Sequence, residues 1–122
     1  MTLVVRCFLL LLSVLSCTVL ARQEFELVLK DHLFTPARLK VPAEQKIKIR
    51  LINADPTPEE FESFALNREK VVLGGAEAVL YLGPLKPGEY EFFGDFNPDS
   101  AKGVIIAVPL SQWHAEQREN VN

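Results

Sequence analysis

The sequence predicts an all-β domain preceded by an export signal, and three observations lead to this fold class. Apolar and polar residues alternate with a period of two, the period of strands whose side chains point to opposite faces of a sheet. Turn-forming residues separate these segments at short intervals. After position 21 the chain has about 101 residues and no cysteine, which is enough for one hydrophobic core. Short strands at this spacing favour a β-sandwich or a barrel.

Residues 1–21 have the features of a secretory signal peptide. Arg6 supplies the positive charge, residues 8–15 form the apolar centre, and Val19-Leu20-Ala21 is a small-residue cleavage site. The alternative is a membrane anchor, which needs about 20 apolar residues, and this run is barely that long. We therefore expect cleavage after Ala21 and delivery to an oxidising compartment outside the cytoplasm.

The composition after the signal excludes several classes of function. Both cysteines, Cys7 and Cys17, lie within the signal, so the mature chain has neither a disulfide nor a thiolate ligand. The mature chain keeps 12 basic and 16 acidic residues, and this mildly acidic balance gives no support to nucleic-acid binding. One alternative stays open, because Val14-Leu15-Ser16-Cys17 weakly resembles a lipobox that would place a lipid anchor on Cys17.

Six segments carry the strand pattern. In the first, Phe25, Leu27 and Leu29 alternate with polar residues. The segments lie at 25–29, 38–41, 46–51, 77–82, 90–93 and 103–108. The last of them is a continuous apolar run, which is typical of a central strand.

The chain is accordingly divided into three parts. Residues 1–21 form the signal peptide, residues 22–110 the β domain, and residues 111–122 a polar tail. For the tail the sequence leaves two alternatives, a short helix or a disordered segment. We expect Trp113 of the tail to pack back against the sandwich.

Connectivity places two loops at the same end of the domain. If the strand at 37–41 runs towards the turn at 42–45 and the strand at 46–53 runs back, residues 31–35 and 54–62 meet at one pole. The pole then carries a group of mostly acidic side chains: Asp31, His32, Asp55, Glu59, Glu60 and Glu62. Crowded acids repel one another and raise each other's pKa values unless a cation neutralises them, so the pole is a candidate binding site.

The same two strands carry a stripe of basic residues. Arg38 and Lys40, together with Lys46, Lys48 and Arg50, point to one outer face if these strands pair. A solvated exterior that blunts sheet aggregation is one interpretation. A docking surface for an acidic partner is the other.

Several motifs in this order resemble cupredoxin-like domains. The opening motifs are Asp31-His32-Leu33-Phe34-Thr35-Pro36 and Leu39-Lys40-Val41-Pro42-Ala43, and the closing one is Lys102-Gly103-Val104-Ile105. The segments at 57–63, 83–88 and 93–103 are most similar to the EfeO- and FtrB-type periplasmic subgroup. The resemblance covers residues 25–108 and implies a Greek-key β-sandwich in the periplasm, with any metal at the pole. It also implies that the loop at 94–102 reaches that pole.

The resemblance implies ligand positions, but the blue-copper ligands are absent from them. Such a site uses two histidines, a cysteine thiolate and usually a weak axial methionine. The cysteine position falls on Gly94, the methionine position near Ala101, the C-terminal histidine position near Asp99 and the upstream one near Glu59 or Glu60. Members of the subgroup commonly have a further histidine where this chain has Asn97. A type-1 copper centre is therefore not expected.

An oxygen-rich set with one imidazole takes the place of those ligands. The candidate metal ligands are His32, Glu59, Glu60, Glu62, Asp95 and Asp99. Carboxylates suit iron or manganese, while imidazole also accepts copper(II), so iron or copper is the expected cofactor. A structural interpretation stays open beside this one, in which the acids are solvated or cap turns and His32 only makes hydrogen bonds.

Two functions follow from these observations. The first is a periplasmic metal-handling protein that resembles components of ferrous-iron uptake systems and acts with an iron permease complex, and in which metal oxidation is an open role. The second is a metal-free interaction module that docks to a periplasmic or membrane partner. A hydrolase is not expected, because Ser63 and Ser100 have no evident base partner and there is no cysteine nucleophile.

Overall fold

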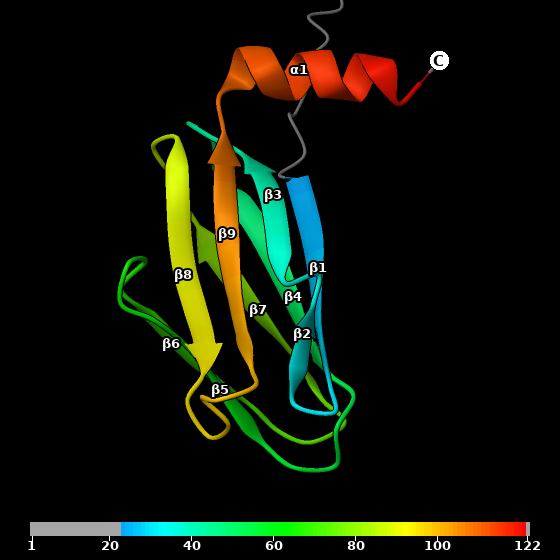
Figure 1. Cartoon of the computed structure of the whole chain (residues 1–122), viewed down its shortest axis with the longest axis vertical. Coiled ribbons are helices and arrows are strands. Elements are labelled where there is room, and N and C mark those ends of the chain that lie inside the picture. The colour runs from blue at the N-terminus through cyan, green and yellow to red at the C-terminus, as the bar shows by residue number, and fades with distance from the viewer. Residues whose placement is uncertain (1–22, 122) are drawn as a thin grey trace, which may run out of the picture.

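The computed structural model describes residues 23–121 and shows two facing sheets with one short helix at an end (Figure 1). The elements are β1 (Gln23–Lys30), β2 (Leu33–Thr35), β3 (Arg38–Pro42), β4 (Ile47–Asn53), β5 (Glu59–Ser63), β6 (Arg68–Val72), β7 (Glu77–Leu82), β8 (Gly88–Gly94), β9 (Lys102–Val108) and α1 (Leu110–Glu119). One sheet has the order β2-β1-β4-β7 and the other β3-β9-β8-β5-β6. This β-sandwich confirms the predicted fold class. The predicted signal peptide and both cysteines lie outside the described residues.

The period-two pattern decides which side chains enter the core. In β4, Ile47, Ile49 and Leu51 are buried, while Lys48 and Arg50 between them are half-buried on the outer face. The buried side chains of both sheets meet in one cluster, because alternate residues of a strand point to the same face.

Three aromatic rings close the core towards one end of the sandwich. The rings of Phe61 and Phe92 stack with centroids 5.0 Å apart, and Phe34 meets Phe92 edge-on at 5.1 Å. Phe61 and Phe92 are each 1% exposed. Offset stacks and edge-to-face contacts contribute stabilisation beyond the burial of apolar area. These three rings therefore form a well-packed part of the core next to the loops described below.

The expected hairpin between the strands around 37–41 and 46–53 is wrong. β3 pairs in parallel with β9, and β4 pairs in parallel with β1, so the turn at 43–46 carries the chain from one sheet to the other. Glu44 in this turn has a φ of 60°. The period-two pattern shows which side chains face the core, but it does not say which sheet a strand joins.

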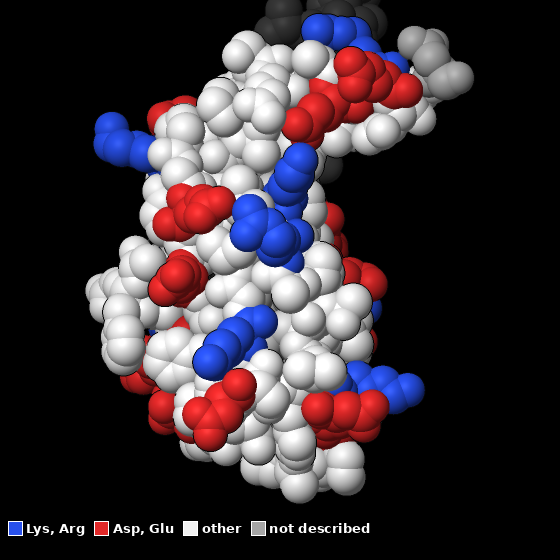
Figure 2. Space-filling model, viewed as in Figure 1, with Lys and Arg blue, Asp and Glu red and all other residues white. Residues whose placement is uncertain are grey.

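The basic stripe is therefore split between the two sheets, and four of its five members pair with acids of this chain. Arg50 lies 3.2 Å from both Glu26 and Glu77, and Lys48 lies 3.5 Å from Glu24. On the other sheet Arg38 lies 3.2 Å from Glu89, and Lys40 lies 3.6 Å from Glu116. Figure 2 shows basic and acidic side chains interspersed over this second face, which favours the solvated interpretation of the stripe.

The tail forms helix α1, which is the first of the two alternatives that the sequence left open. Its Trp113 is 8% exposed, and the ring meets Phe25 of β1 edge-on with centroids 6.0 Å apart. The expected packing of Trp113 is thus confirmed. The helix lies at the end of the sandwich opposite the loops at 54–58 and 95–101 (Figure 1). Within residues 23–121 there is no helix with the length and apolar character needed to cross a bilayer.

Candidate functional site

Three segments meet at the end of the sandwich opposite α1, and we call this end the loop pole: the turn at 31–32, the segment 54–58 and the loop 95–101 (Figure 1). The backbone N–H of Asp31 donates to Oδ1 of Asp55 at 2.7 Å, and the N–H of Asp95 donates to the carbonyl of Glu60 at 2.8 Å. The prediction that residues 31–35 and 54–62 share a pole is confirmed, and so is the arrival of the loop before β9.

His32 lies on the turn between β1 and β2, where Asp55 holds it. Asp31 and His32 have φ values of 52° and 57°, the left-handed conformation that a tight hairpin turn requires at both central residues. Asp55 accepts the N–H of His32 at 3.0 Å as well as that of Asp31, and Nδ1 of His32 lies 3.6 Å from its Oδ2. These N–H groups, that of His32 foremost, hold the pKa of the Asp55 carboxyl below its usual range, although burial acts in the opposite direction.

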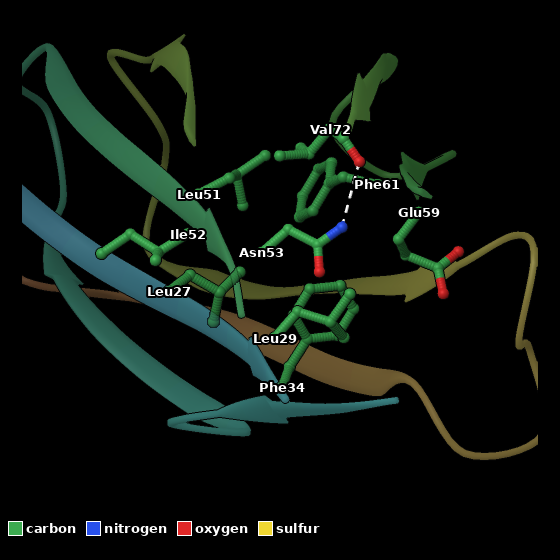
Figure 3. A pocket seen from close by; sticks show the side chains of 9 residues that line it. All are labelled: Leu27, Leu29, Phe34, Leu51, Ile52, Asn53, Glu59, Phe61 and Val72. Carbon is green, nitrogen blue, oxygen red and sulfur yellow. Dashed lines mark hydrogen bonds between the residues drawn. The ribbon is translucent and has the colours of Figure 1, made fainter. Parts of the chain in front are cut away.

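Asn53 organises the segment that carries Asp55. Its Nδ2 donates to the carbonyls of Thr57 at 2.8 Å and Val72 at 3.1 Å, and its Oδ1 accepts the N–H of Asp55 at 3.0 Å. Figure 3 shows the bond to Val72 beside the apolar side chains of the core. The cavity at this point holds about 10 Å³, which leaves no room for an organic ligand.

Glu59 is buried at the start of β5, with 2% of the residue exposed. Its Oε1 accepts the N–H of Phe96 at 2.8 Å and that of Glu60 at 3.0 Å, and its Oε2 accepts Nδ2 of Asn97 at 2.7 Å. The carboxylate points away from the apolar side chains that surround Phe61 (Figure 3). Glu59 therefore joins β5 to the loop 95–101.

Gly94 and Ala101 complete the surroundings of the Glu59 carboxylate. The N–H of Gly94 donates to the carbonyl of Ala101 at 2.7 Å. A Cβ at position 94 would lie 2.6 Å from Cδ of Glu59 and 2.8 Å from Cβ of Ala101. The positions that the resemblance assigns to a cysteine, a methionine and a histidine ligand thus come together, but they hold no sulfur and no imidazole. This donor set does not fit a blue-copper ion.

An acidic triad, Glu60, Glu62 and Glu69, lies on the outer face of β5 and β6. Glu62 faces Glu69 in the strand register, and the three residues each offer a carboxylate oxygen within 4.8 Å of the others. In the part of the chain that the structure describes, no other acid, histidine or cysteine side chains form such a group of three. Partial burial and then the hydrogen bond and charge of Glu69 raise the pKa of Glu62, with smaller contributions from the charges of Glu60 and Asp95.

The six predicted ligands therefore do not form one cluster within residues 23–121. The structure brings together only Glu60 and Glu62, and it adds Glu69 to them. Glu59 belongs to the same strand but points inward, because successive side chains of a strand face opposite sides. His32 lies beside Asp55, and Asp95 and Asp99 are exposed in the loop before β9.

Glu69 was missed because residues 68–72 were not predicted to be a strand. The signal was present in the run Glu60, Glu62 and Glu69, since two acidic segments joined by a short turn place their acids across from each other. β5 was likewise taken for a loop, because its inward side chains are those of Glu59, Phe61 and Ser63 and only one of the three is apolar.

Apolar side chains flank the acidic triad on the same outer face. Phe93 faces Glu62 in the register of β5 and β8, and Val71 faces Glu60 across β5 and β6. Phe64 is 80% exposed and its ring lies 5.6 Å from that of Phe93. Exposed aromatic side chains are enriched in protein contact surfaces, whereas carboxylates are depleted there.

Comparison with known proteins extends these observations. The model of the cupredoxin-like domain family matches residues 2–107. An uncharacterized protein of Rickettsia prowazekii (strain Madrid E) is 49% identical over 83 residues, which make up 68% of this chain and 66% of that protein.

Solved structures with a similar fold include several copper proteins. Amicyanin from Paracoccus versutus has a TM-score of 0.57 at 12% identity and covers 70% of this chain, with 81% of amicyanin matched. The metal binding domain of the Cu(I) exporting P-type ATPase CopA of Streptococcus pneumoniae D39 has a TM-score of 0.59 at 18% identity, over 70% of this chain and 84% of that domain. Auracyanin A, a blue copper protein from Chloroflexus aurantiacus, reaches 0.62 at 12% identity, over 72% of this chain and all of that chain. The match to the family model spans most of the sequence, and the chain belongs to the cupredoxin-like domain family.

Proposed function

We propose that this chain is an exported cupredoxin-like protein that binds a hard transition-metal ion, iron in the first place, at the acidic triad. The observation that carries the proposal is the approach of the carboxylates of Glu60, Glu62 and Glu69 to within 4.8 Å of one another. The setting is the periplasm, and the function is metal handling in ferrous-iron uptake beside an iron permease. The similarity of the motifs at 57–63 and 93–103 to the EfeO- and FtrB-type subgroup supports this setting.

The chemistry of the triad favours iron or manganese over copper. Three carboxylates form an all-oxygen donor set, and such sets suit harder ions than the thiolate and imidazole ligands of blue copper do. Partial burial and Glu69 raise the pKa of Glu62, so the charged form of this carboxyl is disfavoured in the fold. A cation bound among the three carboxylates would relieve their mutual repulsion.

Metal titration of the purified protein tests the proposal. We expect saturable binding of Fe(II), Fe(III) or Mn(II) by isothermal calorimetry, and its loss in a Glu60→Gln, Glu62→Gln, Glu69→Gln variant. The matched control removes three other exposed acids of the same sheet and the adjoining loop, Glu89→Gln, Glu91→Gln and Asp99→Asn, and should bind as the unmodified protein does. The proposal fails if the unmodified protein shows no saturable binding, or if the triad variant binds equally well.

A second candidate function is a metal-free docking module, and the exposed aromatic side chains after β5 and in the loop before β9 favour it. Phe64 and Phe96 are 80% and 50% exposed, and large exposed apolar residues beside polar ones mark contact surfaces. The function predicts that the immobilised protein retains a membrane or periplasmic partner in the presence of EDTA, and that Phe64→Ser with Phe96→Ser abolishes retention. A partner that binds only the metal-loaded protein would contradict it.

A further inference from the structure

We infer that the metal position of this fold is filled in this chain by a carboxylate plug, which consists of Glu59 with its partners Asn97, Gly94 and Ala101. Hydrogen bonds of the plug, and not a shared metal ion, connect β5 to the loop before β9. The loop pole therefore keeps its conformation without an ion. This inference is independent of the proposed iron site, because the acidic triad lies on the outer face of the sheet while Glu59 points inward.

The hydrogen bonds of Glu59 leave little capacity for an ion. An ionised carboxylate has about four lone-pair positions, and three of them accept N–H groups at 2.7 to 3.0 Å from Glu60, Phe96 and Asn97. Hydrogen bonds to an ionised acceptor are among the stronger ones in proteins. A metal ion at this carboxylate would have to displace donors that are held by the backbone of β5 and of the loop.

The small residues around the carboxylate are the second part of the evidence. A Cβ at position 94 would lie 2.6 Å from Cδ of Glu59 and 2.9 Å from its Oε1, distances that real Cβ contacts do not reach. A ligating side chain at Gly94 and the Glu59 carboxylate therefore exclude each other. Gly94 leaves the space that Glu59 fills, and Ala101 borders the same space, because a Cβ added at position 94 would lie 2.8 Å from the Cβ of Ala101.

The loop also has its own backbone support. The N–H of Asn97 donates to the carbonyl of Gly94 at 3.1 Å, and the N–H of Ala101 donates to the carbonyl of Asn97 at 2.9 Å. These bonds orient the Asn97 amide towards Glu59, so the loop presents a donor where a metal-binding loop would present a ligand. The order of residues 95–101 should consequently not depend on metal.

Hydrogen exchange of the Phe96 amide, followed by NMR with the purified protein, tests the plug. We expect equal protection in EDTA and after addition of Cu(II) or Fe(II), and at least tenfold faster exchange in Glu59→Ala. Glu91→Ala is the matched control, because Glu91 is an exposed acid of the same sheet and its side chain accepts none of these bonds. In this variant the Phe96 amide should exchange as in the unmodified protein.

A charge-swapped pair keeps the test decisive if Glu59→Ala does not fold. Asn97→Asp alone places two carboxylates face to face and should expose the Phe96 amide at pH 7. Glu59→Gln with Asn97→Asp restores one donor opposite one acceptor and should recover most of the protection. Failure of this rescue, or metal-dependent protection of Phe96 that disappears in Glu59→Ala, would overturn the inference. Loss of metal binding in the triad variant alone bears on the proposed iron site and leaves the plug intact.

Discussion

Replacement of Asp55 by asparagine should destabilise the protein through the turn between β1 and β2. The Asp55 carboxylate accepts the N–H groups of Asp31 at 2.7 Å and of His32 at 3.0 Å, and both donors belong to residues with positive φ. In Asp55→Asn one acceptor oxygen becomes an NH₂ group, so one N–H loses its partner. A hydrogen bond to a charged group contributes about 2 kcal/mol to folding. For a domain of this size we expect Tm to fall by roughly 8–16 °C.

The pH dependence of this loss separates charge from packing. The pKa of Asp55 is lowered in the folded protein. Its contribution to folding stability is therefore complete above the pKa of an aspartate in the unfolded chain, about 3.9. This contribution is lost as the pH falls through the lower pKa of Asp55 in the folded state. The Tm difference between Asp55→Asn and the unmodified protein, measured by calorimetry, should therefore be full at pH 7 and shrink below about pH 4. Asp99→Asn removes an exposed acid of the same pole and should change Tm little. An equal loss at pH 3 and pH 7 would refute the assignment to the ionised carboxylate.

Three further predictions concern the acidic face, the core and the helix. Glu62→Gln should raise Tm at pH 7, because the raised pKa of Glu62 marks a folded state that disfavours its charge; the gain should vanish below about pH 4.3, where the group is protonated in both states, and a gain that persists there would contradict this cause. Phe61→Ala removes a ring stacked on Phe92 and should cost about 3–5 kcal/mol in urea unfolding, whereas a cost below about 1 kcal/mol would show that the core collapses around the gap. Trp113→Ala should detach α1, with lost helical signal in circular dichroism and a lower midpoint for urea unfolding; an unchanged spectrum and midpoint would show that the helix does not depend on this contact.

The predicted site shows where reasoning from the sequence reached its limit. Connectivity was enough to bring residues 31–32 and 54–55 to one pole, because it depends only on the direction in which strands run. It was not enough to orient Glu59, since a buried carboxylate looks the same in a sequence as a solvated one. Its partners Phe96 and Asn97 lie 37 and 38 positions further along the chain, and only the meeting of β5 with the loop before β9 reveals them.

The sequence by itself determined the β class, the core side of the strands that it identified, and the absence of cysteine from residues 18–122, because these depend on residue type and on a period of two. The tertiary structure alone decided how strands pair across the two sheets, which separated Arg38 from Arg50 and placed Glu69 opposite Glu62. It also decided that Glu59 turns inward, where its carboxylate accepts hydrogen bonds from the loop before β9, while Glu60 is half-buried on the other side of the strand. The physical reason is that pairing between distant strands is selected by the packing of the whole core, which no local pattern contains.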